Sequence, residues 1–169
     1  MIEVFVSGMA FDTLSKAPVV LLREIEGPRV LPIWIGTNEA AVIALELSGV
    51  KYRRPLTHDL LKSVIDGFNA KVQKIIISSL KENTYYARLY ILAAENSIVE
   101  IDARPSDSIA MALKTKAPIF VSDNLNGSFV DLLKNEGQED STDDVFNDSM
   151  DLKKRLRNIK PDDLSDFKG

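Results

Sequence analysis

The stretch IVEIDARPSDSIAMAL, residues 98–113, decides the fold of this chain because a strand pattern passes there directly into a helix pattern. Apolar residues of the strand lead up to Asp102, and a helix is predicted from Pro105 or Ser106 to about Lys116. A helix N-terminus has unpaired N–H groups and partial positive charge. Polar residues gathered at this junction can therefore bind an anion, hold a metal or cap the helix.

Further strand patterns lie on both sides of this junction. Runs rich in β-branched residues, separated by short polar turns, predict strands at about 2–11, 19–25, 30–35, 70–80, 85–94, 97–101 and 119–121. The first six form two consecutive sets of three. The sequence therefore predicts an α+β fold, with a mixed, mainly antiparallel sheet, two three-strand groups and intervening helices.

Two more helices are predicted between these strand groups. The first opens after Gly36 with Thr37 or Asn38 as its N-cap, and the second starts at Thr57, which can cap it. Glu39 and Glu46 of the first helix share one side two turns apart, too far for one small ion but suited to two contacts across an interface. One face of the second helix collects its apolar residues, Leu60, Leu61, Val64, Ile65 and Phe68.

Composition excludes several classes of chemistry. The 169 residues are 45% hydrophobic, as in a soluble globular protein with one main domain. The chain has no cysteine and a single histidine, His58, which removes disulfides, thiolate chemistry and ordinary zinc sites. Any metal would be a hard ion on carboxylates. No stretch is long and apolar enough for a membrane span, no signal peptide is indicated, and we expect a cytoplasmic protein.

Charge is unevenly distributed along the chain. Residues 1–121 carry 14 Lys/Arg and 13 Asp/Glu, whereas residues 122–169 carry 7 and 12. Residues 125–133 predict one or two more helical turns, and 136–169 predict an acidic connection followed by a short helix. We therefore expect a main domain over residues 1–135 and an appended acidic tail.

Three segments in order resemble the bifunctional nuclease family of bacteria and plants, which is also known as a domain of unknown function. They are residues 31–40, 54–60 and 102–110. The resemblance spans roughly residues 1–135 and implies a compact α+β domain, a homo-oligomer such as a dimer, and cleavage of both RNA and DNA. The UVR motif that follows the domain in many relatives has no clear match here.

The strand-to-helix junction supplies the first candidate site. Asp102 and Asp107 can face a common crevice as ligands of Mg²⁺ or Mn²⁺, with Arg104 between them as a phosphate clamp and Ser106 adding a hydroxyl. The alternative is purely structural. Ser106 then caps the helix, Asp107 complements the helix dipole, and Arg104 ties the aspartates into an ion-pair network.

The second candidate site is the segment from Arg54 to Asp59. His58 is the conventional acid–base residue of the chain, and Arg54 can bind an anion. The alternatives are capping or packing for His58 and pairing between segments for Arg54. Tyr85, Tyr86 and Tyr90 share one strand, where ordinary sheet packing explains them.

Two functions follow from these residues and from the resemblance. The first is a metal-assisted nuclease that hydrolyses RNA or single-stranded DNA. The second is a non-enzymatic oligomeric module that binds a ligand or a protein and uses the same charges structurally; the acidic balance of the chain favours it over a tight nucleic-acid binder.

Overall fold

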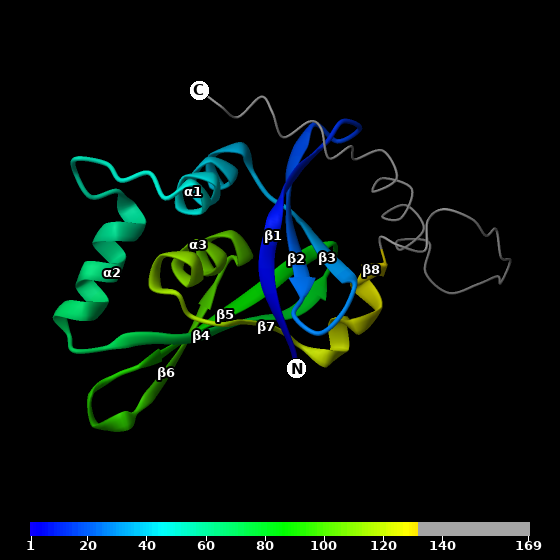
Figure 1. Cartoon of the computed structure of the whole chain (residues 1–169). Coiled ribbons are helices and arrows are strands. Elements are labelled where there is room, and N and C mark those ends of the chain that lie inside the picture. Colours follow the sequence, from blue (N-terminus) through cyan, green and yellow to red (C-terminus); the bar gives the residue numbers. More distant parts are fainter. Residues whose placement is uncertain (132–169) are drawn as a thin grey trace, which may run out of the picture.

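The computed structural model describes residues 1–131, which form one eight-stranded sheet with three helices (Figure 1). The strand order is β6-β5-β4-β7-β1-β2-β3-β8. The strands are β1 (Ile2–Asp12), β2 (Ala17–Glu24), β3 (Arg29–Trp34), β4 (Lys71–Lys81), β5 (Thr84–Leu92), β6 (Ile98–Ala103), β7 (Ile119–Val121) and β8 (Val130–Asp131). The helices are α1 (Thr37–Ser48), α2 (Thr57–Gly67) and α3 (Pro105–Thr115), with short 3₁₀ helices η1 (Ala94–Asn96) and η2 (Asp123–Ser128).

The sheet consists of two antiparallel meanders joined by one short strand. Strands β1, β2 and β3 form one meander, and β4, β5 and β6 form the other. Strand β7 runs parallel to β4 and antiparallel to β1. This arrangement confirms the predicted α+β class, the mixed and mainly antiparallel sheet, and its two three-strand groups.

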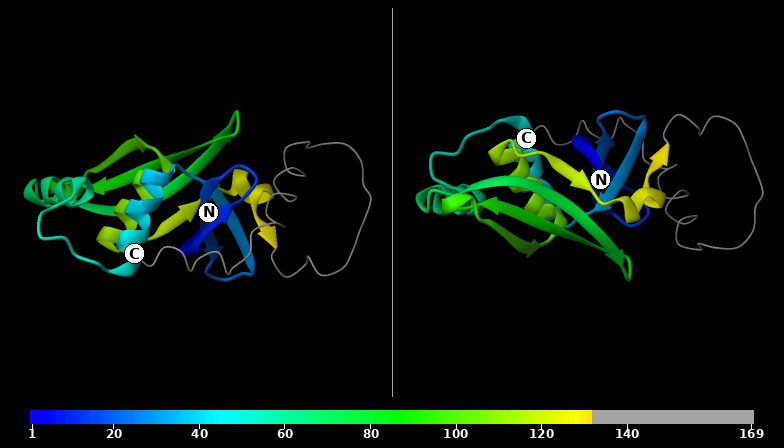
Figure 2. Two further views of the ribbon diagram at one scale, coloured as in Figure 1. Left: turned by 90° about the horizontal axis from the view of Figure 1, so that it is seen from above. Right: turned by 90° about the horizontal axis from the view of Figure 1, so that it is seen from below.

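Helix α3 packs against β4 and β5 and lies beside α1, while α2 stands at the end of the molecule away from β8 (Figures 1 and 2). Pro105 occupies the first helical turn as predicted, and seven of the eleven residues of α3 are buried. Apolar side chains of α3, including Ile109 and Met111, join the core formed by one face of the sheet. Within residues 1–131, no helix is long and apolar enough to cross a membrane.

The chain after β7 differs from the prediction. Residues 125–133 were expected to be helical, but η2 ends at Ser128 and Val130–Asp131 pair with β3 as β8. Gly127 and Asn126 favour a turn rather than a regular helix, and the β-branched Val130 fits the free edge of β3. The predicted tail over 136–169 lies outside the described residues.

The predicted helix caps are also wrong. Gly36 and Leu56 occupy the N-cap positions of α1 and α2, while Thr37 and Thr57 are the first helical residues. Arg104, rather than Ser106, is the N-cap residue of α3, and its side chain makes no capping bond. The start of α2 is instead held from inside the helix, because the Leu56 N–H donates to the Asp59 carboxylate at 2.8 Å.

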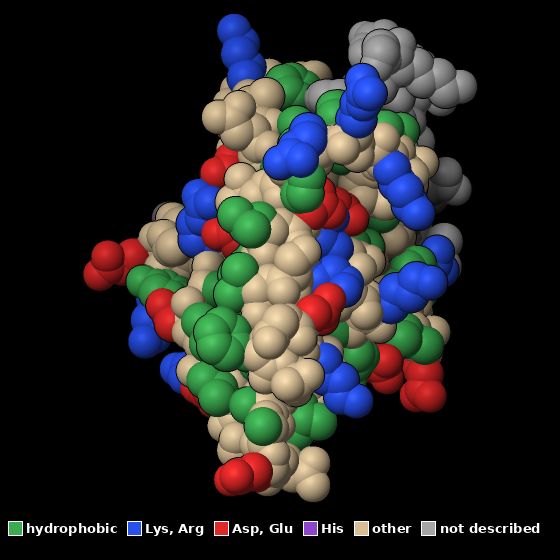
Figure 3. Space-filling model, turned by 90° about the vertical axis from the view of Figure 1, so that its left-hand side faces the viewer, with side chains coloured by type: hydrophobic (Ala, Val, Ile, Leu, Met, Phe, Trp, Pro, Cys, Tyr) green, Lys and Arg blue, Asp and Glu red, His purple; other side chains and the backbone are tan. Residues whose placement is uncertain are grey.

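Most of the apolar face of α2 is uncovered in the single chain. Ile65 is buried, whereas Leu60 is 60% and Phe68 is 77% exposed, and Leu61 and Val64 are exposed between them. Hydrophobic side chains accordingly gather in a band along this side of the molecule (Figure 3). The apolar face of this amphipathic helix is therefore largely in contact with water in the single chain.

Candidate functional site

The first turns of the three helices meet around Arg104. Its guanidinium binds the Asp107 carboxylate in a bidentate manner, with Nε–Oδ2 2.7 Å and Nη2–Oδ1 3.1 Å. Nη1 donates to Glu39 Oε1 of α1 at 2.8 Å. His58 of α2 completes the group, with Nε2 3.5 Å from Asp107 Oδ1. We call Glu39, His58, Arg104 and Asp107 the Arg104 cluster.

The cation of the Arg104 cluster is exposed to solvent. Arg104 is 65% exposed, whereas the His58 side chain is largely buried. Hydrogen bonds to Asp107, and then to Glu39, raise the pKa of Arg104 further above its ordinary value. The guanidinium has five N–H donors, and contacts among the described residues use three of them. One N–H on each Nη atom therefore remains for a ligand.

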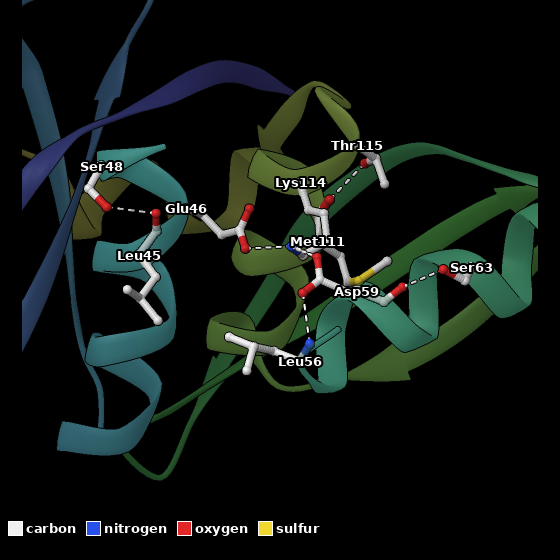
Figure 4. Close-up of polar contacts among 9 residues, drawn as sticks. All are labelled: Leu45, Glu46, Ser48, Leu56, Asp59, Ser63, Met111, Lys114 and Thr115. Carbon is white, nitrogen blue, oxygen red and sulfur yellow. Dashed lines mark hydrogen bonds and ion pairs between the residues drawn. The ribbon is translucent and has the colours of Figure 1, made fainter. Parts of the chain in front are cut away.

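A second cluster, buried more deeply, ties the same three helices together (Figure 4). Lys114 of α3 lies between Glu46 of α1, at 2.6 Å, and Asp59 of α2, at 2.5 Å. Burial alone would lower the pKa of Lys114, but the hydrogen bonds to Asp59 and Glu46 outweigh it and the pKa is raised. Hydrogen bonds from Lys114 and from the Leu56 N–H lower the pKa of Asp59. We call Glu46, Asp59 and Lys114 the Lys114 cluster.

The two clusters explain the spacing of the acidic residues in α1. Glu39 meets Arg104, and Glu46 meets Lys114, so both glutamates face α3. The predicted pair of contacts across an interface is therefore confirmed. Asp59 fixes the start of α2, and His58, the preceding residue, is thereby held beside Asp107.

The other residues predicted for the site lie apart from one another. Asp102 of β6 is opposite Arg88 of β5, on the sheet face away from α3, because the neighbouring partners Ala103 and Ala87 face the core. No described contact joins Asp102 to Asp107. Ser106 is buried in the first turn of α3. Arg54 lies in the exposed loop that leads into α2.

A divalent metal was predicted to lie between Asp102 and Asp107. Within residues 1–131, no three acidic or histidine side chains form a group that could hold a metal ion. The register of β6 also points Asp102 away from α3. The two aspartates, as arranged, therefore do not form a joint ligand set. Both oxygens of Asp107 accept hydrogen bonds from Arg104.

Comparison with known proteins assigns the family. The sequence model of the bifunctional nuclease domain matches residues 20–128, a span that includes both clusters. The chain belongs to the bifunctional nuclease domain family. An uncharacterized protein of Mycobacterium tuberculosis is 40% identical over 163 residues, which cover 96% of this chain and 97% of that protein.

Plant members of the bifunctional nuclease family match a smaller part of the chain. Bifunctional nuclease 1 of Oryza sativa subsp. japonica is 26% identical over 113 residues, 66% of this chain and 34% of that protein. Bifunctional nuclease 2 of Arabidopsis thaliana is 26% identical over 106 residues, 62% of this chain and 32% of that protein. The family and these relatives indicate a nuclease function at the level of the family.

Sequence reasoning missed the partners that complete each cluster. Lys114 was not singled out, and Glu39 was considered only as half of a pair of contacts across an interface. The available signal was that both α1 and α3 carry charged residues at each end. Only the parallel packing of the two helices brings opposite charges together.

Proposed function

We propose that the protein is a nuclease that hydrolyses RNA and single-stranded DNA at the Arg104 cluster. The observation that supports this is an exposed guanidinium, clamped on two carboxylates, beside the only histidine of the chain. Such a group combines a fixed phosphate-binding donor with an acid–base residue, the two elements that phosphodiester hydrolysis needs from side chains.

Each residue of the Arg104 cluster has a distinct part in this proposal. Asp107 and Glu39 fix the plane of Arg104, whose two remaining N–H groups bind phosphate oxygens. Asp107 also orients His58. His58 Nε2 lies 3.5 Å from Asp107 Oδ1, so the other ring nitrogen of His58 is the one that accepts a proton from an attacking water.

The charge of the cluster calls for additional cations when a phosphate binds. Two carboxylates surround one guanidinium, so these three side chains together carry a net negative charge. The exposed loop before α2 supplies Lys51, Arg53 and Arg54, of which Arg54 is the proposed substrate contact. Mg²⁺ or Mn²⁺ on Asp107 and the substrate phosphate would supply further positive charge; a role of Asp102 in holding it stays a prediction.

The decisive experiment measures cleavage of end-labelled RNA and single-stranded DNA by the full chain in Mg²⁺, Mn²⁺ or chelator. We expect Arg104→Gln to slow cleavage by about 10²–10³-fold and His58→Gln by about 10²-fold or more. Lys62→Gln is the matched control, because it also removes the cation of an exposed ion pair, with Asp66, but outside the cluster. Circular dichroism verifies that each variant is folded.

Several outcomes would reject parts of the proposal. Wild-type protein that leaves both substrates intact rejects the nuclease function, and unchanged cleavage by both cluster variants places the chemistry elsewhere. The metal has a separate readout, because Mn²⁺ on Asp107 would broaden the NMR signals of His58, the sole histidine. Persistence of that broadening in Asp107→Asn excludes Asp107 as the ligand.

The exposed face of α2 favours a second property, assembly of the chain into a homodimer. Leu60, Leu61, Val64 and Phe68 form a charge-free stripe whose self-association would remove large apolar side chains from water. Sedimentation velocity tests it. We expect a dimer for the wild type and a monomer for Leu60→Asn/Phe68→Asn, with Lys62→Gln unchanged. A monomeric wild type would contradict this proposal.

A further inference from the structure

The face of β4 and β5 that points away from the helices carries aromatic and basic side chains in alternation. On β5, Ala87, Leu89 and Ile91 point to the core, so the residues between them lie on the opposite face. These are Tyr86, which is 40% exposed, the exposed Arg88, and the half-buried Tyr90. One face of β5 therefore packs in the core, and the other presents tyrosine and arginine side chains at the surface.

Each of the two tyrosines is accompanied by a lysine of the neighbouring strand. Lys74 of β4 is the register partner of Tyr90, and its Nζ lies 5.1 Å from the ring centroid. Lys81 approaches Tyr86 in the same way, at 5.6 Å. No ion pair within the described part of the chain involves either lysine. We call Lys74, Lys81, Tyr86, Arg88 and Tyr90 the tyrosine–lysine face.

We propose that the tyrosine–lysine face binds single-stranded nucleic acid, with bases stacked on the two tyrosines and phosphates held by the two lysines. The inference rests on the proposed function, because it gives the substrate of that nuclease a binding surface outside the Arg104 cluster. Tyr86 and Tyr90 are four residues apart on a strand, about 13 Å. Each ring therefore serves a different base, and the sheet keeps both rings fixed.

Two lysines without an ion pair favour a polyanion as the ligand. Three cations, Lys74, Lys81 and Arg88, share this side of the sheet with the β6 carboxylates Glu100 and Asp102, and Arg88 is paired with Glu100. The unpaired lysines therefore have their charges available for phosphates, in a protein whose net charge is -4. Aromatic rings beside unpaired cations suit single-stranded nucleic acid, which offers unstacked bases and phosphates together.

The tyrosine–lysine face leads toward the junction at which Arg104 begins α3. Asp102 is the cross-strand partner of Arg88 and marks the end of the face on β6, the edge strand of the sheet. Arg104 follows two residues later, about 7 Å along an extended chain. A strand lying across the face and over the edge of β6 would thus deliver its next phosphates to the Arg104 cluster.

Fluorescence anisotropy of labelled single-stranded RNA and DNA, in chelator to prevent cleavage, tests this inference on the full chain. Tyr86→Ala/Tyr90→Ala is expected to weaken binding by 10-fold or more, whereas the matched Tyr86→Phe/Tyr90→Phe variant keeps the rings and binds like the wild type. Lys74→Gln/Lys81→Gln is expected to weaken binding and to reduce the slope of log K against log salt by about 1.4. Asp102→Asn removes a negative charge beside Arg88 and is expected to tighten binding.

The outcomes separate this inference from the proposed nuclease function. If the wild type binds oligonucleotides through the tyrosines but cleaves them in no metal, the proposed binding by the tyrosine–lysine face is supported and the nuclease function is rejected. If the protein cleaves its substrates but binds them independently of the tyrosines, the nuclease function is supported and the proposed binding face is overturned. Tyrosine substitutions that alter the sedimentation coefficient rather than oligonucleotide affinity would also overturn it, because the face would then contact a second copy of the chain.

Discussion

The Arg104 cluster and the Lys114 cluster have the same arrangement of charges but differ in their exposure to water. Each sets a cation of α3 between two carboxylates, one of them from α1. Arg104 is 65% exposed, whereas the Lys114 side chain is 10% exposed. Water therefore screens the first cluster and is largely excluded from the second.

This difference in burial indicates that one cluster is suited to ligand binding and the other to stabilising the fold. An exposed ion pair adds little to stability, and its cation remains accessible to a ligand. A cation buried between two carboxylates is costly to remove, because the carboxylates are left facing each other in a poorly solvated place. We therefore interpret the Lys114 cluster as stabilising the packing of the three helices and the Arg104 cluster as the group that binds a ligand.

The largest expected effect is on stability, from substitution within the Lys114 cluster. Lys114→Met keeps a similar side-chain length but leaves Glu46 and Asp59 without their shared cation. Because the cluster is only partly buried, we expect a loss of about 2–3 kcal/mol in the free energy of unfolding, below the full value for a buried pair. Urea denaturation at pH 7 measures it.

The matched control removes an exposed lysine from an ion pair on α2. Lys62→Met breaks the pair with Asp66 and is expected to cost less than about 0.5 kcal/mol. Equal losses in the two variants would show that burial does not distinguish the Lys114 cluster from a surface ion pair.

The Arg104 cluster is expected to respond in activity rather than in stability. Arg104→Lys keeps the positive charge but lacks the planar fork that binds Asp107 through two N–H groups and Glu39 through a third. We expect cleavage between that of the wild type and that of Arg104→Gln, with the urea midpoint near that of the wild type. Wild-type cleavage rates in Arg104→Lys would mean that charge alone suffices, and would remove the fork from the proposed mechanism.

The fold was predictable to the extent that local patterns determine it. Alternating runs and polar turns located both meanders, and β7 was found from the three residues Ile119–Val121. The sequence did not reveal that β7 joins the two meanders, since strand pairing between distant segments has no local signature. The same limit explains β8, whose two residues are a strand only because the edge of β3 is free.

The candidate site was predictable in its residue types but not in its grouping. Arg104, Asp107 and His58 were all singled out, and the structure brings them together. Asp102 was grouped with Asp107 because they are close in sequence, yet strand alternation places Asp102 on the other face of the sheet. Contacts of Glu39 and Lys114 depend on how helices pack, and a single sequence does not show that.

The smallest expected effect is a pH dependence confined to the Lys114 cluster. The pKa of Asp59 is lowered in the folded protein, first by Lys114 and then by the Leu56 N–H. Its stabilising contribution is therefore complete above the unfolded pKa, about 3.9, and is lost as the pH falls through the lower folded value. Asp59→Asn should then destabilise most at pH 7, by less than about 1 kcal/mol because the carboxylate is partly exposed, and progressively less below pH 4. Urea titrations of both proteins between pH 3 and 7 measure this trend.

The same comparison in a Lys114→Met background should show a weaker trend, since the main cause of the lowered Asp59 pKa is gone. An unchanged trend there would mean that the Leu56 N–H, rather than Lys114, holds the charge of Asp59.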